Sequence, residues 1–522
     1  MPDSWTNNAA GVDLHLELPP GHGRRAALEN ALRQAIRDGR LAAGERLPSS
    51  RALAGQLGLA RGTVVEAYSQ LVAEGYLRSR QGAVTEVARG PGMPPTPATV
   101  PAPTRVVADF RLGRPDLSLF PRAEWLRALR RALHVTPHAE LGPLDPRGAL
   151  RLRTALAGYL GRARGVLTTP ERIVICSGFT QGLRLVCDAL AVAGATSIAV
   201  ENPCLPDHRA TLAAAGLDSI PLDVDQHGAR PDADAAPAAA VLLTPAHQAP
   251  MGVTLAADRR SEFVRLATAA GTYLIEDDYD GEFRYDRHPV GALQGLAPEQ
   301  VVYAGSASKS LAPGLRLGWL ALPADLVDAV VEAKRRADRG TDVLAQLALA
   351  ELIESGALDR HIRRMRRRYR QRRDALVHTL GRAVPAIPLQ GIAAGLHAVL
   401  VLPEGQSEAD VLAAARQRQI ALTGLAPFWH GPPKAEGIVL GYGTPAEHEY
   451  RRALAHLGQL LGGLASLDGG EAKLEPPRKF GGLASLDEGE AKLEPPRKFG
   501  GLASLDGGEA KLEPPKNPRH SR

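Results

Sequence analysis

Lys309 lies in the segment GSASKSLAPGLRLGW (305–319), close to several groups that bind anions. A lysine amine becomes a nucleophile when burial or a neighbouring cation lowers its pKa, and it can then form a Schiff base with an aldehyde. Ser306, Ser308 and Arg316 would add hydroxyl groups and a guanidinium that bind an anion beside the amine. Because most lysines near strand ends are merely solvated, this segment does not by itself establish such a site.

A second segment, SGFTQGL (177–183), follows the apolar run RIVIC and begins a predicted helix. Gly178, Phe179 and Thr180 would present backbone N–H groups at the start of that helix. Helix N-termini bind phosphate through such groups and through the helix dipole. We therefore expect this turn to bind the phosphate of a cofactor.

A third segment, EDDYDGEF (276–283), follows the apolar run YLI. A carboxylate at the end of a strand can pair with a protonated pyridine nitrogen and keep the ring electron-poor, and Asp277 is the candidate. Tyr279 could hydrogen-bond the phenolic oxygen of the same ring. An aldehyde with a phosphate and a pyridine ring is pyridoxal 5′-phosphate (PLP). The three segments together predict a PLP site, with Lys309 as the Schiff-base residue.

Short β-branched runs alternate with helix-like stretches throughout the region that holds these segments. This alternation is typical of βαβ units and predicts an α/β fold with a mixed, mainly parallel sheet covered by helices on both faces. Ligands of such sheets bind at the carboxyl ends of the strands, where all three segments are expected. The runs are RIVICSG (172–178), SIAVEN (197–202), AAVLLTP (239–245), YLIEDD (273–278) and VVYAGS (301–306).

Near the other end of the chain, residues 25–87 are dense in helix signals. ALENALRQAIRDG has apolar residues at helical spacing, and Ser49 or Ser50 can cap a second helix. A short turn, LGLARG, leads to a third helix that opens with Arg61 and Thr63. Two helices joined by a tight turn, with arginine and threonine at the start of the second, are typical of a helix-turn-helix that reads base edges in the major groove.

The alternative is a small helical domain with solvated arginines, because residues 1–87 hold ten arginines against nine acidic residues. The placement of the residues favours DNA binding instead. The pattern LPSSR…LA…L…ARGTV…AY..L..EGYL..R.G closely resembles the GntR-type winged helix, and YLRSRQGAVTEVA would form the wing. By this resemblance, the residues expected to contact double-stranded DNA are Arg51, Arg61, Thr63, Tyr68 and Arg80.

The larger region resembles the fold type I aminotransferases, which bind PLP. Together with the winged helix, the chain up to about residue 460 resembles the MocR subfamily of GntR regulators, through DFRLGRPDLSLFPRAEW, LDPRG, HQAPMG and KSLAPGLRLGW. The resemblance implies a transcriptional regulator whose aminotransferase-like domain binds PLP and acts as a sensor. It also implies a head-to-tail homodimer and control of genes for vitamin B6 synthesis or amine metabolism.

The chain departs from the aminotransferase pattern where an amino acid would be positioned. Leu205 stands where an aromatic residue often stacks on the pyridine ring, and Ala249 replaces the asparagine of an NPxG turn. Pro143 stands where a tyrosine usually opens a turn, and Val439 where an arginine clamps the substrate carboxylate. A site without that clamp orients an amino acid poorly, so we expect a PLP sensor rather than a transaminase.

Other functions stay open. An amine or amino acid could react with bound cofactor and act as the effector, with Arg209, Arg284 or another arginine as the clamp. The chain could also be an active aminotransferase with an accessory DNA-binding domain, or a DNA-binding dimer with an enzyme-like scaffold. The basic run RHIRRMRRRYRQRR (360–373) is expected to be the solvated face of a long helix, with a second DNA-phosphate surface as the alternative.

The domain organisation follows from composition. A GGLASLDGGEAKLEPPRKF repeat begins at Gly462 and recurs twice. Its few large apolar residues predict a disordered tail rather than a solenoid. The expected zones are a winged helix (12–87), a Pro- and Ala-rich linker (88–108), the aminotransferase-like domain (109–462) and the tail (463–522).

Composition also limits the location and the cofactors. No run of about 18 apolar residues exists, and no basic segment followed by an apolar one opens the chain, so we expect a cytoplasmic protein without membrane contact. The three cysteines lack CxxC spacing, so we expect reduced thiols and no metal site. A net charge of +6 permits contact with nucleic acid without requiring it.

Overall fold

The chain divides into two compact units, Met1–Thr104 and Arg105–Arg522. The division falls inside the expected linker, most of which lies outside the described residues, and the finer domain boundaries stay predictions. The structure, a computed structural model, describes residues 23–79, 84–88, 106–142, 145–231, 238–285 and 290–467.

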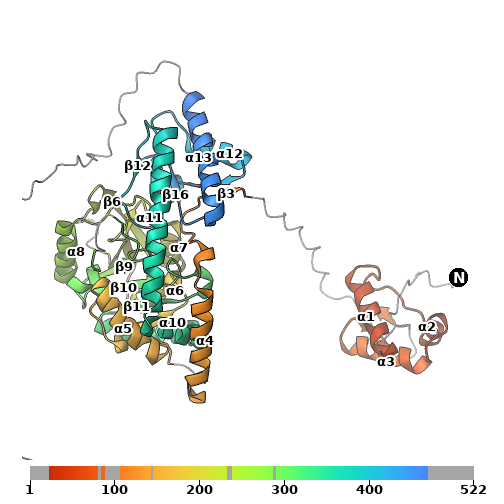
Figure 1. The fold of residues 1–522 in the computed structure, drawn as a ribbon. Helices are drawn as coiled ribbons and strands as arrows, with labels where there is room; N and C mark the ends of the chain where they lie inside the picture. Colours follow the sequence, from red (N-terminus) through yellow and green to blue (C-terminus); the bar gives the residue numbers. More distant parts are fainter. Residues whose placement is uncertain are drawn as a thin grey trace, which may run out of the picture. The chain divides into compact units, whose positions relative to one another are not determined.

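The described part of the first unit holds three helices and a pair of short antiparallel strands (Figure 1). The Ser49 hydroxyl caps the second helix by accepting a hydrogen bond from the Ala52 amide at 3.2 Å, and Gly58 ends that helix in the left-handed region. These elements match the helix-turn-helix and wing expected from the sequence. The elements are α1 (Arg24–Arg37), α2 (Ser50–Leu57), α3 (Arg61–Ala73), β1 (Leu77–Arg78) and β2 (Glu86–Val87).

The centre of the second unit is an eight-stranded sheet in the order β4-β11-β10-β9-β8-β5-β6-β7. Neighbouring strands from β10 to β6 run parallel, while β11 is antiparallel to both of its neighbours and β7 is antiparallel to β6. The predicted α/β class with a mixed, mainly parallel sheet is therefore confirmed. The strands are β4 (Ile173–Cys176), β5 (Ser197–Asn202), β6 (Asp218–Asp225), β7 (Gly228–Ala229), β8 (Ala240–Leu243), β9 (Tyr273–Asp277), β10 (Val301–Ser306) and β11 (Gly318–Ala321).

Helices cover both faces of this sheet. All four residues of β4 are buried, and alternate residues join opposite cores: Val174 packs with α6 and α9, and Ile175 with α5 and α10. A strand buried on both faces is a continuous apolar run, which is why these strands were recognisable in the sequence. The helices are α4 (Arg122–Val135), α5 (Leu150–Arg164), α6 (Phe179–Val192), α7 (Pro206–Ala214), α8 (Ala257–Ala270), α9 (Val327–Ala337) and α10 (Val343–Glu354).

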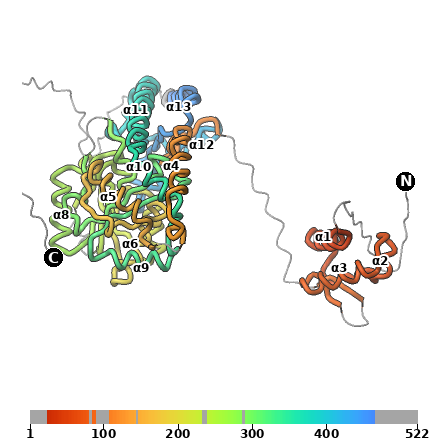
Figure 2. Tube along the Cα trace, turned by 60° about the horizontal axis from the view of Figure 1, so that its bottom comes forward, coloured from red at the N-terminus to blue at the C-terminus, as the bar shows by residue number. Residues whose placement is uncertain are grey.

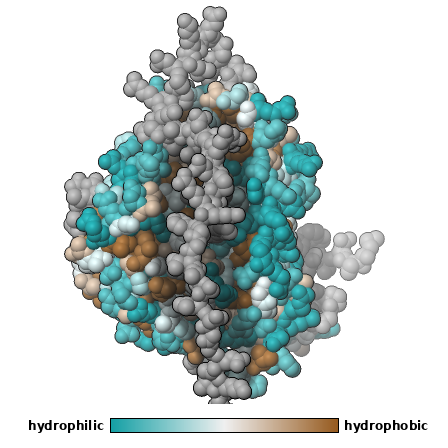
Figure 3. All heavy atoms as spheres, turned by 60° about the vertical axis from the view of Figure 1, so that its left-hand side comes forward, coloured by the Kyte–Doolittle hydropathy of each residue, from teal (hydrophilic) through white to brown (hydrophobic). Residues whose placement is uncertain are grey.

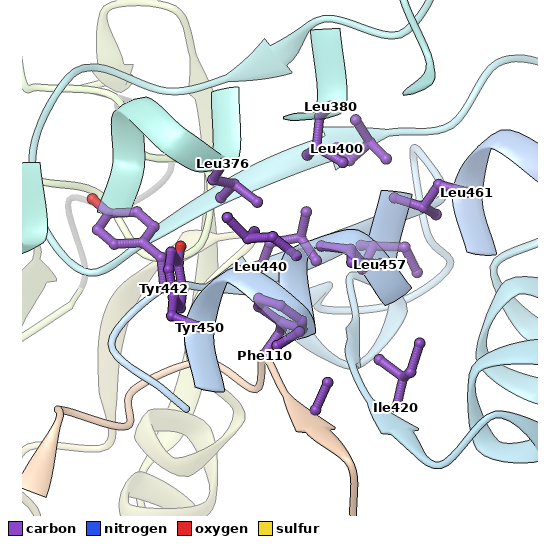
Figure 4. Packing of buried hydrophobic residues seen from close by; sticks show 14 of the residues in the cluster. Phe110, Leu376, Leu380, Leu400, Ile420, Leu440, Tyr442, Tyr450, Leu457 and Leu461 are labelled. Atoms are coloured by element: carbon purple, nitrogen blue, oxygen red, sulfur yellow. The ribbon is translucent and has the colours of Figure 1, made fainter. Parts of the chain in front are cut away.

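A second sheet, in the order β12-β13-β16-β15, packs with α11 and α13, which lie side by side (Figures 1 and 2). Phe110, Leu440, Leu457 and Leu376 meet in its core (Figure 4). Phe110 directly follows β3, so this core fixes the segment just after the predicted linker. The elements are β3 (Ala108–Asp109), α11 (Ala357–Ala383), β12 (Leu389–Gln390), β13 (His397–Val401), α12 (Glu408–Gln417), β14 (Ile420–Ala421), which pairs with β3, β15 (Thr423–Gly424), β16 (Gly437–Gly441) and α13 (Glu447–Leu467).

The basic run 360–373 lies on α11. Most of its arginines are exposed, as expected for a solvated helix face, but Arg372 is buried and pairs with Asp116 at 2.6 Å. Hydrophilic residues dominate the face of the molecule drawn in Figure 3, with hydrophobic residues in separated patches. Among the described helices, none combines the length and the hydrophobicity needed to cross a lipid bilayer.

The last helix, α13, continues past Gly462 to Leu467. The tail expected from residue 463 therefore begins with helical residues. Leucine and alanine favour helix, and each glycine costs only about 1 kcal/mol there, so the helix extends into the first repeat. Residues 468–522 lie outside the described residues, and their disorder stays a prediction.

A buried ion pair supports the loop after β9. Arg164 Nε lies 2.6 Å from Asp278 Oδ2, and both side chains are 1% exposed. Tyr303 donates a further hydrogen bond to the same carboxylate at 2.7 Å. A Cβ at Gly281 would overlap both partners, so the loop needs glycine at this position.

We expect Asp278→Ala to destabilise the second unit by roughly 3–5 kcal/mol, because it leaves the Arg164 charge buried without its partner. Urea denaturation followed by circular dichroism measures the change. Glu332→Ala is the control, since Glu332 pairs with the half-exposed Arg335 and Arg336 and should matter little. Equal effects of the two substitutions would contradict this account of the loop.

Candidate functional site

Lys309 lies just beyond β10, at the wall of a cavity of about 240 Å³. Its Nζ donates a hydrogen bond to the Gly113 carbonyl at 2.7 Å. Gly113 has φ +80°, and a Cβ there would stand 3.2 Å from Nζ. Glycine at this position therefore leaves room for the amine, which the sequence analysis did not recognise in the motif RLGRPD.

The cavity brings together the three segments singled out in the sequence. Of the nine residues expected to hold the cofactor, eight line it. The ninth, Gly178, lies beside them, because a Cβ on it would stand 3.3 Å from the Arg316 guanidinium. The eight residues are Phe179, Thr180, Asp277, Tyr279, Ser306, Ser308, Lys309 and Arg316.

A guanidinium and a helix N-terminus lie together at this cavity. Helix α6 begins at Phe179 without a side-chain cap, and its N-cap Gly178 has φ 90°. Arg316 follows the short 3-10 helix Pro313–Leu315 in the left-handed region and donates a hydrogen bond to the Ser177 carbonyl in the same turn. Uncapped amides beside a guanidinium are suited to bind a phosphate.

Asp277, the last residue of β9, is buried at the cavity wall. Burial raises the pKa of Asp277, and His208 Nε2, 3.3 Å from its Oδ2, opposes that shift. Among the described residues, His208 Nε2 has no hydrogen-bond partner of good geometry. The sequence analysis missed His208, although it considered Leu205 in the same ENPCLPDH segment.

The Lys309 amine lies in a low-dielectric environment. Burial lowers the pKa of Lys309, and the carboxylates of Asp280 and Asp277 partly oppose this effect. A lowered pKa leaves more of the amine neutral near physiological pH than in a solvated lysine, and the neutral amine is the nucleophilic form.

Tyr279 lines the cavity, but its hydroxyl already has a partner. It donates to the backbone carbonyl of His247 at 2.9 Å and lies 3.1 Å from His247 Nδ1. Burial raises the pKa of Tyr279 well above its usual value, so the hydroxyl keeps its proton. The expected hydrogen bond to the cofactor ring would require this hydroxyl to change partners.

Two exposed arginines lie at the starts of helices in the described part of the winged-helix unit. Arg51 is the second residue of α2 and Arg61 the first of α3; both are exposed, and within the described ranges neither has a hydrogen bond or ion pair. Thr63 lies half-buried beside Arg61. By contrast, Arg33 is bound to Glu74 at 2.9 Å. The free guanidiniums at the helix starts are the ones suited to read bases.

The structure places Tyr68 differently from the expected DNA contact. Its side chain is buried, and its hydroxyl donates to the Pro48 carbonyl at 2.9 Å. Tyr68 shares the core face of α3 with Val64, four residues before it, and Leu71, three residues after it. In this position it supports the chain that leads into α2.

An ion pair links the two strands after α3. Arg78 pairs with Glu86 across them. Arg80 lies outside the described residues. Arg46, which the sequence analysis did not single out, is exposed and bridges to Glu86 through the backbone.

Two protein families match the chain: "Bacterial regulatory proteins, gntR family" over residues 24–87 and "Aminotransferase class I and II" over residues 110–428. The chain is 34% identical over 458 residues to the HTH-type pyridoxine biosynthesis transcriptional regulator PdxR of Corynebacterium glutamicum, covering 85% of this chain and 98% of that protein. It is 30% identical over 442 residues to the probable rhizopine catabolism regulatory protein MocR of Rhizobium meliloti, covering 80% and 89%. The chain belongs to the MocR subfamily of GntR-type transcriptional regulators.

The larger domain of this MocR-type regulator also resembles solved aminotransferases. It is 25% identical to the α-aminoadipate aminotransferase LysN from Thermus thermophilus, crystallised with N-(5′-phosphopyridoxyl)-L-leucine. The match covers 69% of this chain and 93% of that one, with a TM-score of 0.61. The fold type I architecture expected from the sequence is confirmed.

The MocR-type cavity holds few groups for a substrate carboxylate. Val439 lies in β16 among apolar side chains. Arg209 donates to two backbone carbonyls at 2.8 Å, Arg284 donates to a threonine hydroxyl at 3.1 Å, and neither lines the cavity. Arg316 is the one arginine among the described residues that line it.

We expect the capture of PLP by Lys309 to reach its plateau at lower pH than capture by a solvated lysine. The neutral amine reacts, and burial lets the proton leave below the ordinary pKa of 10.5. Stopped-flow absorption with PLP across a pH series measures the midpoint, and N-acetyl-lysine methyl ester is the solvated reference. A midpoint at or above that of the reference amine would contradict the lowered pKa.

We expect Arg61→Ala to weaken binding to the specific operator by about tenfold or more, since one bidentate contact to guanine contributes roughly 1–3 kcal/mol. The operator is first selected by the protein from random duplexes, and fluorescence anisotropy then compares it with unrelated DNA. Arg40→Ala removes another exposed arginine, which pairs with Asp38, and should affect both DNAs equally if at all. Loss of affinity for both DNAs to the same degree in Arg61→Ala would show a phosphate contact instead.

Proposed function

We propose that this chain is a transcriptional regulator that captures PLP through Lys309 and whose operator binding depends on occupancy of that cavity. The observation that carries the proposal is the convergence of a lysine of lowered pKa, a buried aspartate and an arginine beside an uncapped helix on one cavity. Its relative PdxR, covered over 98% of its length, is named for pyridoxine biosynthesis.

The residues of the cavity fit PLP. Asp277 offers a buried carboxylate for the pyridine nitrogen, and His208 Nε2 lies 3.3 Å from that carboxylate. The amides of Phe179 and Thr180 and the Arg316 side chain would hold the phosphate, with the Ser306 and Ser308 hydroxyls. Bound PLP would supply an aldehyde that reacts reversibly with a primary amine.

Three residues of the chain would favour the reaction between the lysine amine and the PLP aldehyde. Burial lowers the pKa of the Lys309 amine and so makes its neutral, nucleophilic form easier to reach, and the Gly113 carbonyl accepts its hydrogen bond and so fixes its direction. Asp277 would hold the ring nitrogen protonated. The protonated ring nitrogen keeps the cofactor electron-poor.

The favoured effector is PLP itself. With apolar Val439 at the clamp position and Arg209 and Arg284 away from the cavity lining, an amino acid carboxylate finds only Arg316, which the phosphate would occupy. An amine that reacts with the bound cofactor is the second candidate, because an amine without a carboxylate needs no clamp. Genes of vitamin B6 synthesis or of amine metabolism are the corresponding targets.

Occupancy of the cavity by PLP would act on the linker through the segment around Gly113. Engagement of the Lys309 amine by a cofactor would compete with its hydrogen bond to Gly113, and the segment that carries Gly113 follows β3 and Phe110 in the chain. A change there would favour one arrangement of the winged helices over another. A head-to-tail homodimer in the cytoplasm, contacting DNA through Arg51, Arg61 and Thr63, completes the proposal.

We expect PLP to change the operator affinity of the wild-type protein by about fivefold or more, and to leave Lys309→Ala unchanged. Fluorescence anisotropy with operator DNA measures affinity with and without PLP. Borohydride reduction and peptide mapping should place PLP on Lys309 in the wild type. If the operator affinity is the same with and without PLP, in protein shown to carry PLP on Lys309, the proposed regulatory role is wrong.

The same samples separate the alternatives. Steady turnover of an amino donor and a keto acid would identify an active aminotransferase. A response to PLP that appears only after an amine is added would identify the amine as the effector. If the protein does not capture PLP, the large domain serves as a scaffold only.

A further inference from the structure

A cluster of two histidines and an aspartate lies beside the cofactor cavity without lining it. His247 follows β8, Asp280 follows β9 and His397 begins β13. One possible ligand atom from each residue lies within 4.8 Å of those of the other two. The side chains are 0–2% exposed. The cluster therefore joins the eight-stranded sheet to the four-stranded sheet in a water-poor interior.

The tautomers of both histidines can be assigned from their partners. His397 Nε2 lies 3.0 Å from the Pro250 carbonyl, which can only accept, so Nε2 carries the proton and Nδ1 a lone pair. His247 Nδ1 lies 2.9 Å from Asp280 Oδ2. It therefore donates to the carboxylate, and His247 Nε2 carries the other lone pair.

Three acceptor atoms of the cluster are consequently left without a donor. They are His247 Nε2, Asp280 Oδ1 and His397 Nδ1, all buried and without a hydrogen-bond partner among the described residues. Buried polar groups are nearly always satisfied, because an unpaired one costs about 1–3 kcal/mol. His247 Nε2 lies across the ring from the nitrogen that faces Asp280. A cation shared by the three residues would therefore take the place of the His247 Nδ1 proton, and would bind that nitrogen, the Asp280 carboxylate and His397 Nδ1.

We propose that His247, Asp280 and His397 form a site for a divalent transition-metal ion of the zinc type. Two imidazole nitrogens and one carboxylate oxygen are a ligand set that zinc accepts, with a fourth position left open. Bond lengths of about 2.0–2.2 Å place tetrahedral ligands roughly 3.4 Å apart, and the possible ligand atoms of the three residues lie within 4.8 Å of one another.

The surroundings of the cluster are those of a metal site. The Pro250 carbonyl orients His397, as outer-shell acceptors orient metal-binding imidazoles. A Cβ at Gly395 would overlap His247 and Asp280, so glycine there keeps the cluster open. The Tyr279 hydroxyl donates to the His247 carbonyl at 2.9 Å, and Tyr279 lines the cofactor cavity. An ion here would hold the two sheets together and fix one wall of that cavity.

The test uses the full chain without an affinity tag, stripped with EDTA, reloaded with ZnCl2 and freed of excess metal by gel filtration. We expect mass spectrometry to find one zinc ion per wild-type chain. We expect Asp280→Asn and His397→Ala to lower zinc affinity in calorimetry by at least about tenfold, because each removes one of three ligands. His378→Ala, which removes an exposed imidazole on α11, is the matched control and should bind like the wild type.

A second readout covers variants that fold poorly. Zinc should raise the melting temperature of the wild type and of His378→Ala, but not of Asp280→Asn, since binding to the folded state stabilises it by mass action. Far-UV circular dichroism of Asp280→Asn reports that the large domain is folded. Wild-type protein that retains no zinc, or zinc bound equally by the wild type and both cluster variants, would overturn the proposal.

Discussion

The hydrogen bond from the Lys309 amine to the Gly113 carbonyl connects two parts of the chain that are 196 residues apart. It requires the segment around Gly113 to be held rigidly, since a lysine side chain alone has many rotamers. Phe110 in the small-sheet core fixes one end of that segment, and the buried Asp116–Arg372 pair fixes the other. The geometry of the reactive amine thus depends on packing in a different sheet.

The carboxyl end of β9 carries three aspartates that burial would make costly if they were unpaired. Each has its own partner: Asp277 lies beside His208, Asp278 binds Arg164, and Asp280 binds His247. The stretch therefore does three things at once. One carboxylate faces the cavity, one anchors the loop to α5, and one contributes to the histidine cluster that joins the sheets.

The two units divide the work of a regulator. In the described part of the winged helix, Arg51 and Arg61 have no ion pair or hydrogen bond, and they stand at the starts of α2 and α3. In the aminotransferase-like unit, Lys309, Asp277 and Arg316 line one cavity, and Arg316 is the one arginine among the described residues of that lining. A chain that binds its cofactor without processing a substrate is suited to sensing.

The sequence by itself determined the apolar runs that became strands, the caps of the winged helix, and the polar residues at the strand ends, because periodicity and capping are local properties. The sequence also determined the family, because the motifs that identify it, including the one with Lys309, are local. Only the tertiary structure decided that Gly113 meets that lysine, that His208 lies against Asp277, and that Tyr68 faces the core. Each of these depends on which distant segments pack together, and the spacing of residues along a chain does not record that.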